Sequence, residues 1–388
     1  MTERPDAPSA RLDVNDRNDP GGLNDRARYW AFRLLAALAP LAPLWLAQRI
    51  AVAAGALLWL CAGGLRRRAE RNLGRIPTLA ADPARLRAAT RGVFINLALN
   101  YLDFFRGRVV TYEELARGWQ ITGWELFEQA MRAGRGVIIL GAHLGPFEYA
   151  AWKLGELGYP LLTPAERLRP ERFNQLVARL RNHHHARLLP GDDRETLREL
   201  LGALRNGQLA MFAIDRWVMG PSDAWPLFGQ PARLPTAPFA LAARSEAPVF
   251  LLVPWRRGLN RYGGSVELIT PERLRPEASA DGEGGSESTG APRGRDREAA
   301  IARMRQRLYP ALERAISEHP EQWVSALSPI WDERDAQPRR SRAAATEEAT
   351  EQTMEQTMEQ APMATTPAIV SGARSALPGG NARVQIAQ

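Results

Sequence analysis

The chain has 388 residues, of which 45% are hydrophobic, so it can bury the core of one large domain with extensions. Its formal net charge of +8 favours an anionic partner such as a membrane surface, and no nucleic-acid motif accompanies the dispersed basic residues. The single cysteine, Cys61, excludes an intramolecular disulfide and a cysteine-based zinc site, and we interpret it as a packed, inert thiol.

The N-terminal part divides into a polar lead and a hydrophobic segment. Residues 1–28 are polar, so we predict a disordered lead without a signal peptide. Residues 29–68 contain two apolar runs that end at three consecutive arginines, 66–68. Because a spanning helix needs about 20 apolar residues, we favour a membrane-associating helix or helical hairpin lying at the interface. A single span, with the following domain in the cytoplasm, and a buried core helix are the alternatives.

Residues 69–334 alternate between amphipathic segments and short apolar runs, which is typical of an α/β domain. The predicted helices cover residues 69–105, 124–133, 148–155, 172–181, 195–204, 235–244 and 299–316. The predicted strands cover residues 121–123, 137–140, 160–163, 188–189, 209–214, 249–253 and 265–269. This pattern predicts a mixed, largely parallel sheet flanked by helices. Residues 278–297 are expected to form a flexible insert, and residues 335–388 a disordered, low-complexity tail.

The most informative stretch is the apolar run 137–140, which is followed by His143 and then by Pro146 and Glu148. Pro146 and Glu148 both suit the first turn of a helix, so His143 should stand where open α/β sheets bind ligands. A His held by a carboxylate can take a proton from an alcohol. No Ser or Cys adjoins His143, so the alcohol would belong to a substrate. The alternative is a core His beside a helix-capping Glu.

Two further polar pairs follow predicted strands, and we expect them at the same edge of the sheet. They are Glu166 with Arg167, and Asp215 with Arg216. Arg167 could bind an anion, while Asp215 and Arg216 could form an ion pair with each other or with Arg167. The three consecutive histidines at 183–185 point in different directions on a helix, which argues against a metal site.

The His-x4-Glu box of His143 and Glu148 resembles that of the lysophospholipid acyltransferase superfamily. Within it, the chain resembles the branch of bacterial lipid A biosynthesis (lauroyl/myristoyl) acyltransferases and phosphatidylinositol mannoside acyltransferases. Further blocks resemble this branch in the same order, at residues 165–171, 214–216, 228–229, 235–242 and 319–323. One departure is Thr236, where the family usually has Gly.

The resemblance implies a glycerol-3-phosphate acyltransferase-like fold and an O-acyltransferase at the cytoplasmic face of the bacterial plasma membrane. Acyl-CoA or acyl carrier protein would be the donor and a glycolipid hydroxyl the acceptor, with no cofactor, metal or acyl-enzyme. His143 would be the general base and Glu148 would orient it, while N–H groups around Gly145 would hold the oxyanion.

The resemblance also implies that Glu166, Arg167, Asp215 and Arg216 bind substrate. A catalytically silent, membrane-bound lipid-binding protein on the same fold is one alternative function. A Ser–His hydrolase is another, although the sequence has no Gly-x-Ser-x-Gly elbow.

Overall fold

The computed structural model describes residues 22–182, 184–191, 194–270 and 294–331. Its centre is a seven-stranded sheet in the order β1-β9-β8-β2-β5-β3-β4. The strands are β1 (Trp119–Thr122), β2 (Val137–Gly141), β3 (Leu161–Ala165), β4 (Ala186–Pro190), β5 (Leu209–Ala213), β8 (Val249–Gly258) and β9 (Arg261–Leu268). Only β8 and β9 pair antiparallel within this sheet. The predicted α/β fold with a mixed, largely parallel sheet is confirmed.

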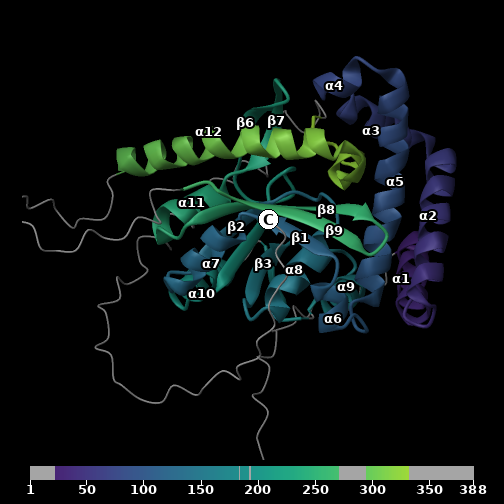
Figure 1. The fold of residues 1–388 in the computed structure, drawn as a ribbon, viewed down its shortest axis with the longest axis horizontal. Helices are drawn as coiled ribbons and strands as arrows, with labels where there is room; N and C mark the ends of the chain where they lie inside the picture. Colours follow the sequence, from purple (N-terminus) through teal and green to yellow (C-terminus); the bar gives the residue numbers. More distant parts are fainter. Residues whose placement is uncertain (1–21, 183, 192–193, 271–293, 332–388) are drawn as a thin grey trace, which may run out of the picture.

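Helices cover both faces of this sheet (Figure 1). The N-terminal helices are α1 (Leu23–Leu38), α2 (Leu44–Cys61), α3 (Gly63–Leu73), α4 (Pro77–Ala80) and α5 (Pro83–Arg106). The others are α6 (Tyr112–Ala116), α7 (Trp124–Arg132), α8 (Phe147–Glu156), α9 (Glu171–Arg181), α10 (Arg194–Arg205), α11 (Ala237–Ser245) and α12 (Gly294–Glu318). Two 3₁₀ turns, η3 (Pro320–Gln322) and η4 (Val324–Leu327), follow α12.

The central strand β2 is buried on both sides, as its uninterrupted apolar sequence predicts. Ile138 and Leu140 pack into a core shared with α5, α10, α11 and α12. Val137 and Ile139 point to the opposite face and pack against α7 and α8. This alternation follows from the two-residue period of a strand. It fixes β2 in the middle of the sheet, so that the residues following it emerge at the carboxyl edge.

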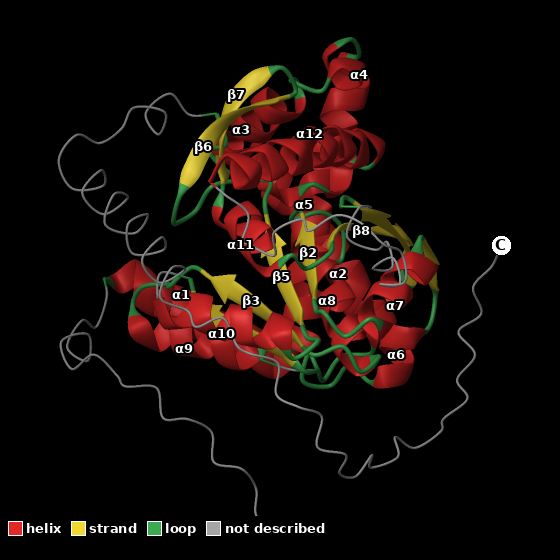
Figure 2. Cartoon of the chain, turned by 90° about the vertical axis from the view of Figure 1, so that its left-hand side faces the viewer, coloured by secondary structure: helices red, strands yellow, loops and turns green. Residues whose placement is uncertain are grey.

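A second, two-stranded sheet was not predicted. It is the antiparallel hairpin of β6 (Ser222–Leu227) and β7 (Gln230–Pro235), which lies beside α12 (Figure 2). Pro226 and Pro231 face each other across the hairpin, and a proline in a strand sequence argues against strand formation. Both prolines are tolerated because each of these strands has only one partner in the described structure. The long helix α12 begins at Gly294, so its first residues lie inside the range 278–297 that was expected to form a flexible insert.

The helices α1 and α2 each pack against α5, and α1 also contacts α9 (Figure 1). The helix α1 begins at Leu23, within the range predicted to be disordered, and residues 1–21 lie outside the described residues. A Cβ at Gly55 of α2 would come within 2.7 Å of the Phe94 carbonyl oxygen, so this glycine lets α2 and α5 pack closely.

The outward face of α2 is apolar. Trp45, Ile50, Leu57 and Leu60 are all exposed, so α2 is not the buried core helix considered as an alternative. By length and composition, α2 could cross a membrane, and 22% of it is buried against the protein. The prediction for Cys61 is wrong: this residue ends α2 on the exposed side and is itself exposed.

Candidate active site

His143 lies just beyond β2, in a loop that the C-terminal part of the described chain holds in place. Leu144 forms an isolated antiparallel bridge with Trp323. On either side of this bridge, the Gly145 N–H donates to the Gln322 carbonyl at 3.1 Å, and the Val324 N–H donates to the His143 carbonyl at 2.9 Å. Residues 322–324 therefore hold the backbone of the His143 loop, both at the bridge and on either side of it.

The carboxylate that contacts the imidazole is Asp215. Its Oδ1 lies 2.9 Å from His143 Nδ1, and its Oδ2 accepts from the His143 backbone N–H at 3.1 Å. The same Oδ2 accepts from Trp323 Nε1 at 2.8 Å. Asp215 follows β5, which pairs with β2 in parallel, and the Ile214 N–H donates to the Gly141 carbonyl at 2.9 Å. Adjacent strand ends thus bring Asp215 and His143 together.

Asp215 is fully buried, and its environment keeps it ionised. Burial alone would raise its pKa, but the charge of His143 and hydrogen bonds from His143, Ser325 and Trp323 outweigh burial. The pKa of Asp215 is therefore held well below its ordinary value. A depressed carboxyl pKa stabilises the fold above the unfolded-state pKa of about 4, and this contribution is lost only as the pH falls towards the folded-state pKa. Asp215 is a carboxylate at neutral pH.

An ionised Asp215 can only accept, so His143 Nδ1 must donate to it. The Ser325 hydroxyl adjoins the same nitrogen at 3.3 Å. The other ring nitrogen, Nε2, is then the proton acceptor of the neutral imidazole. About 26% of the His143 side chain is exposed, whereas Asp215 is inaccessible. This arrangement can remove a proton from a hydroxyl group brought to Nε2 and can stabilise the imidazolium that forms.

Comparison with known proteins identifies the family. Residues 25–328 match the family model described as bacterial lipid A biosynthesis acyltransferase. The chain belongs to this family. It is 27% identical over 198 residues to a phosphatidylinositol mannoside acyltransferase of Mycobacterium tuberculosis, covering 50% of this chain and 61% of that protein. It is 25% identical over 219 residues to the protein of that name in Mycolicibacterium smegmatis, covering 53% and 70%.

In this acyltransferase family member, Glu148 does not occupy the position expected for the residue that orients His143. Glu148 Oε1 accepts from Arg181 Nε at 2.8 Å, which ties the first turn of α8 to the end of α9. The guanidinium of Arg181 also lies 5.6 Å from the centre of the Phe104 ring. The orienting contact expected of Glu148 is thus made by Asp215, while a catalytic role for Glu148 stays a prediction.

We expect Glu148→Gln and Arg181→Gln to cause similar losses of activity, because each breaks the same α8–α9 contact. The double variant should be about as active as the less active of the two single variants, because the effects of two residues that form one pair are not additive. Steady-state acyl transfer by the four proteins, including the wild type, measures this. A Glu148→Gln enzyme that is inactive beside a fully active Arg181→Gln enzyme would show that Glu148 acts on the reaction directly.

The other residues predicted to bind substrate differ in their exposure and in their ion-pair partners. Glu166 and Arg167 follow β3 at the expected edge but are exposed, and Arg167 Nε pairs with Glu171 at 3.3 Å. The considered pairing of Arg167 or Arg216 with Asp215 is not what the structure shows, because His143 is the ion-pair partner of Asp215. Arg216 is half-buried directly after it. Substrate binding by these residues stays a prediction.

Gly145 allows the backbone of the His143 loop to pass close to β8. Among the N–H groups around Gly145 that were predicted to hold the oxyanion, that of Gly145 itself donates to the Gln322 carbonyl. The φ of Gly145, +59°, is favourable only for glycine, and a Cβ there would lie 2.2 Å from the Pro254 carbonyl oxygen. The N–H groups of Phe147, Glu148 and Tyr149 are further candidates, because the first N–H groups of a helix have no intrahelical acceptor.

One residue of the histidine run at 183–185, His184, makes two contacts within the protein. His184 Nδ1 lies 2.7 Å from Glu156 Oε1, and its Nε2 lies 2.9 Å from the Gly107 carbonyl oxygen. His183 lies outside the described residues. No group of three or more His, Cys, Asp or Glu side chains in the described ranges could hold a metal ion.

Proposed function

We propose that this protein is a membrane-associated O-acyltransferase. It would transfer a fatty acyl chain from acyl-CoA or acyl carrier protein to a hydroxyl of a glycolipid, either a phosphatidylinositol mannoside or a lipid A-type precursor. The observation that carries the proposal is the His143–Asp215 pair, with its buried carboxylate and accessible imidazole. Family membership and the relatives named phosphatidylinositol mannoside acyltransferase support this choice of reaction.

In the proposed reaction, His143 Nε2 takes the proton of the acceptor hydroxyl as its oxygen attacks the thioester carbonyl carbon. The Asp215 carboxylate stabilises the imidazolium, and the N–H groups at the start of α8 stabilise the oxyanion. Collapse of the tetrahedral intermediate breaks the carbon–sulfur bond. The departing thiolate then receives the proton from His143, so the free thiol and the new ester are the products. No residue of the protein is acylated.

We also propose that the protein acts at the cytoplasmic face of the bacterial plasma membrane. Both substrates carry long apolar chains, and the exposed apolar residues of α2 offer a surface that such a membrane would cover. Arginines 66–68 lie in α3, the helix that follows α2, and would lie near the headgroups of anionic lipids. The match covers 61% of the length of each of the two Mycobacterium tuberculosis relatives. The activity of those complete proteins is therefore part of the proposal.

The test is acyl transfer by the purified full-length protein in detergent. Palmitoyl-CoA and palmitoyl carrier protein would each be offered with phosphatidylinositol mannosides and with lipid A precursors, using wild type and His143→Ala. We expect one donor–acceptor pair to react with the wild type and transfer to be lost in His143→Ala. Equal, slow loss of thioester in both proteins, without transfer to any acceptor, would favour the catalytically silent lipid-binding protein.

A further inference from the structure

The strand β8 continues beyond the end of its neighbour β2. Residues 249–252 of β8 pair with residues 138–141 of β2, but β8 runs on to Gly258 while the chain after β2 turns away into the loop that carries His143. Within the described sheet, the last residues of β8 therefore pair only with β9. The backbone groups on the side of β8 away from β9 need other partners, because leaving a buried N–H or carbonyl group unpaired costs free energy.

Arg256 presents its backbone N–H and carbonyl to this open side of β8. Just before β8, the Pro248 carbonyl accepts from the Ile138 N–H of β2 at 2.9 Å, which shows the direction in which β2 lies. The two backbone groups of one strand residue point to the same side, and the side alternates along the strand. Arg256 follows Pro248 by an even number of residues, so its backbone groups point to the space into which β2 does not extend.

The side chain of Gln322 occupies this space. Its Oε1 accepts from the Arg256 N–H at 2.7 Å, and its Nε2 donates to the Arg256 carbonyl at 3.0 Å. An amide side chain offers one acceptor and one donor group, as a peptide unit does, so it can replace a neighbouring strand at a single residue. Gln322 is buried, and both hydrogen bonds are therefore shielded from water.

The backbone of Gln322 faces the loop that carries His143. The Gln322 carbonyl accepts from the Gly145 N–H at 3.1 Å, and Gly145 packs against the Pro254 carbonyl of β8. Gln322 thus joins β8 to this loop, with its side chain on the strand and its backbone on the loop. It contributes in this way to the position of His143 relative to the sheet.

The two elements that Gln322 joins are themselves attached to α5. The side chain of Arg256 is buried and pairs with Asp103 of α5, which fixes this part of β8. In η3, the Glu321 carbonyl accepts from Asn96 Nδ2 of α5 at 3.0 Å, which fixes the turn directly before Gln322. The helix α5 is therefore a common support for the strand and the turn.

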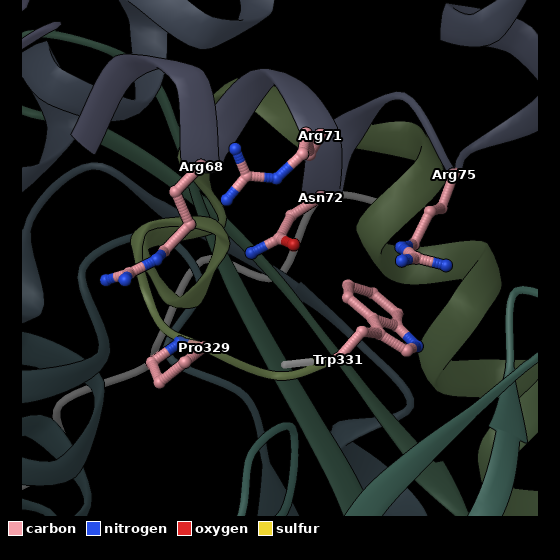
Figure 3. Close-up of a pocket in the computed structure, with 6 residues that line it drawn as sticks. All are labelled: Arg68, Arg71, Asn72, Arg75, Pro329 and Trp331. Atoms are coloured by element: carbon pink, nitrogen blue, oxygen red, sulfur yellow. The ribbon is translucent and has the colours of Figure 1, made fainter. Parts of the chain in front are cut away.

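The segment that follows Gln322 is held from another side by α3. Asn72 of α3 is buried, and its Nδ2 donates to the Ala326 carbonyl at 2.8 Å and to the Ser328 carbonyl at 2.9 Å. Asn72 and Trp331 line a shallow pocket between α3 and this segment (Figure 3). Residues 322–325, which hold the loop and contact His143 and Asp215, thus lie between two fixed attachments.

We propose that Gln322 is a positioning residue for His143. The proposal rests on the proposed function for the reaction, in which His143 is the base, and on the structure for the geometry. Gln322 does not touch the reacting atoms. By joining the loop to β8, it keeps His143 Nδ1 on the Asp215 carboxylate and leaves Nε2 directed at the acceptor hydroxyl. Without its amide group, Arg256 would lose both backbone partners and the loop would lose this attachment to β8.

The kinetic test compares Gln322→Met with Gln48→Met in the purified full-length protein. Both glutamines are buried, and methionine has a similar size but cannot replace the amide. Gln48 Nε2 donates to Asn260 Oδ1 at 2.6 Å in the turn between β8 and β9, so the control removes a hydrogen bond from the same hairpin. Gln48 does not contact the loop that carries His143.

We expect Gln322→Met to lower kcat about 10- to 100-fold with KM values within about twofold, because a displacement of about 1 Å is enough for such a loss. Acyl transfer with the donor–acceptor pair that the wild type uses gives both constants. Both should stay within about twofold of the wild type in Gln48→Met. Equal losses of kcat in the two variants would overturn the proposal, since they would show a general effect of a weakened hairpin.

Nuclear magnetic resonance examines His143 without turnover. In protein that contains isotope-labelled histidine, the shifts of the two ring nitrogens distinguish the Nδ1–H from the Nε2–H tautomer, and the His143 signals are those absent from His143→Ala. At about pH 8.5, an ordinary histidine is neutral. We expect the Nδ1–H tautomer in the wild type and in Gln48→Met, and a mixture of tautomers in Gln322→Met. The same tautomer in all three proteins would overturn the proposal, whatever their kinetics.

Gln322→Glu supplies the test if Gln322→Met does not fold, as judged by circular dichroism. This substitution keeps the length of the side chain and its acceptor but removes the donor to the Arg256 carbonyl. Protonation of the introduced carboxyl group restores a donor, so the ratio of its kcat to that of the wild type should rise as the pH falls. A ratio that is independent of pH would contradict the proposal.

The tautomer also separates this proposal from the proposed function. A wild type that transfers no acyl group, but shows the expected difference in tautomer between Gln322→Met and Gln48→Met, would support the role of Gln322 and reject the reaction. A wild type that transfers acyl groups equally well with and without the Gln322 amide would support the reaction and reject the role of Gln322.

Discussion

Asp215→Asn should lower kcat by about 10³- to 10⁴-fold while the protein stays folded. The reason is the direction of the hydrogen bonds around this side chain. Oδ2 accepts from two fixed donors, the backbone N–H of His143 and Trp323 Nε1. The single oxygen of an Asn side chain would have to remain there, which turns its NH₂ group towards His143 Nδ1. The imidazole would then carry its proton on Nε2 and could not accept one from the acceptor hydroxyl.

Single-turnover acyl transfer measures this loss directly, with circular dichroism as the check on folding. Asp223→Asn is the matched control, because Asp223 is exposed and pairs with Arg305 on α12, and it should keep the wild-type rate. Combining Asp215→Asn with His143→Ala should cost little more than His143→Ala alone, since the two residues act as a unit. An Asp215→Asn enzyme with a rate near that of the wild type would refute the assignment of Asp215 as the orienting carboxylate.

Gly145→Ala should destabilise the protein by about 2–5 kcal/mol and abolish most of its activity. An alanine at a φ of +59° is strained, and its Cβ would lie 2.2 Å from the Pro254 carbonyl oxygen, which belongs to β8 and cannot move independently of the sheet. Relief of the clash would push the loop away from β8. His143 and the bridge between Leu144 and Trp323 would move with it.

Gly134→Ala separates the two contributions to this loss. Gly134 has a φ of +73°, but a Cβ there would have no neighbour within 4 Å, so the substitution costs only the backbone strain of about 1 kcal/mol. Denaturant unfolding of both variants gives the free energy of unfolding, and the difference between them is the cost of the clash. Equal losses in Gly134→Ala and Gly145→Ala would show that the close approach to β8 does not constrain the loop.

Much of the fold was predictable because local patterns determine it. The strand at residues 137–140 is apolar throughout and is bounded by glycines, and its burial on both faces follows. The hairpin of β6 and β7 could not be predicted in the same way. Its prolines make it look like a loop, and it forms because each strand needs only one partner.

The site was predictable only in outline. Parallel strands place His143 and Asp215 at one edge, and the sequence indicated both residues. Which carboxylate reaches Nδ1 depends on β2 and β5 being neighbours, and the five-residue spacing of His143 and Glu148 contains no information on this. Trp323 and Ser325 are 108 and 182 residues away from the groups that they contact, Asp215 and His143. Only the resemblance of residues 319–323 to the last of the family's ordered blocks pointed to that region.

The contacts by which residues 322–324 hold the His143 loop have a consequence for the newly made protein. On the ribosome, His143 and Asp215 emerge long before residues 322–325, which supply the backbone partners of the loop and the Trp323 donor to Asp215. We therefore expect a nascent or C-terminally truncated chain to fold its sheet yet lack an aligned base. Activity would begin only after residues 322–325 have been synthesised and have folded onto the loop, which would protect cellular thioesters from hydrolysis by shorter chains.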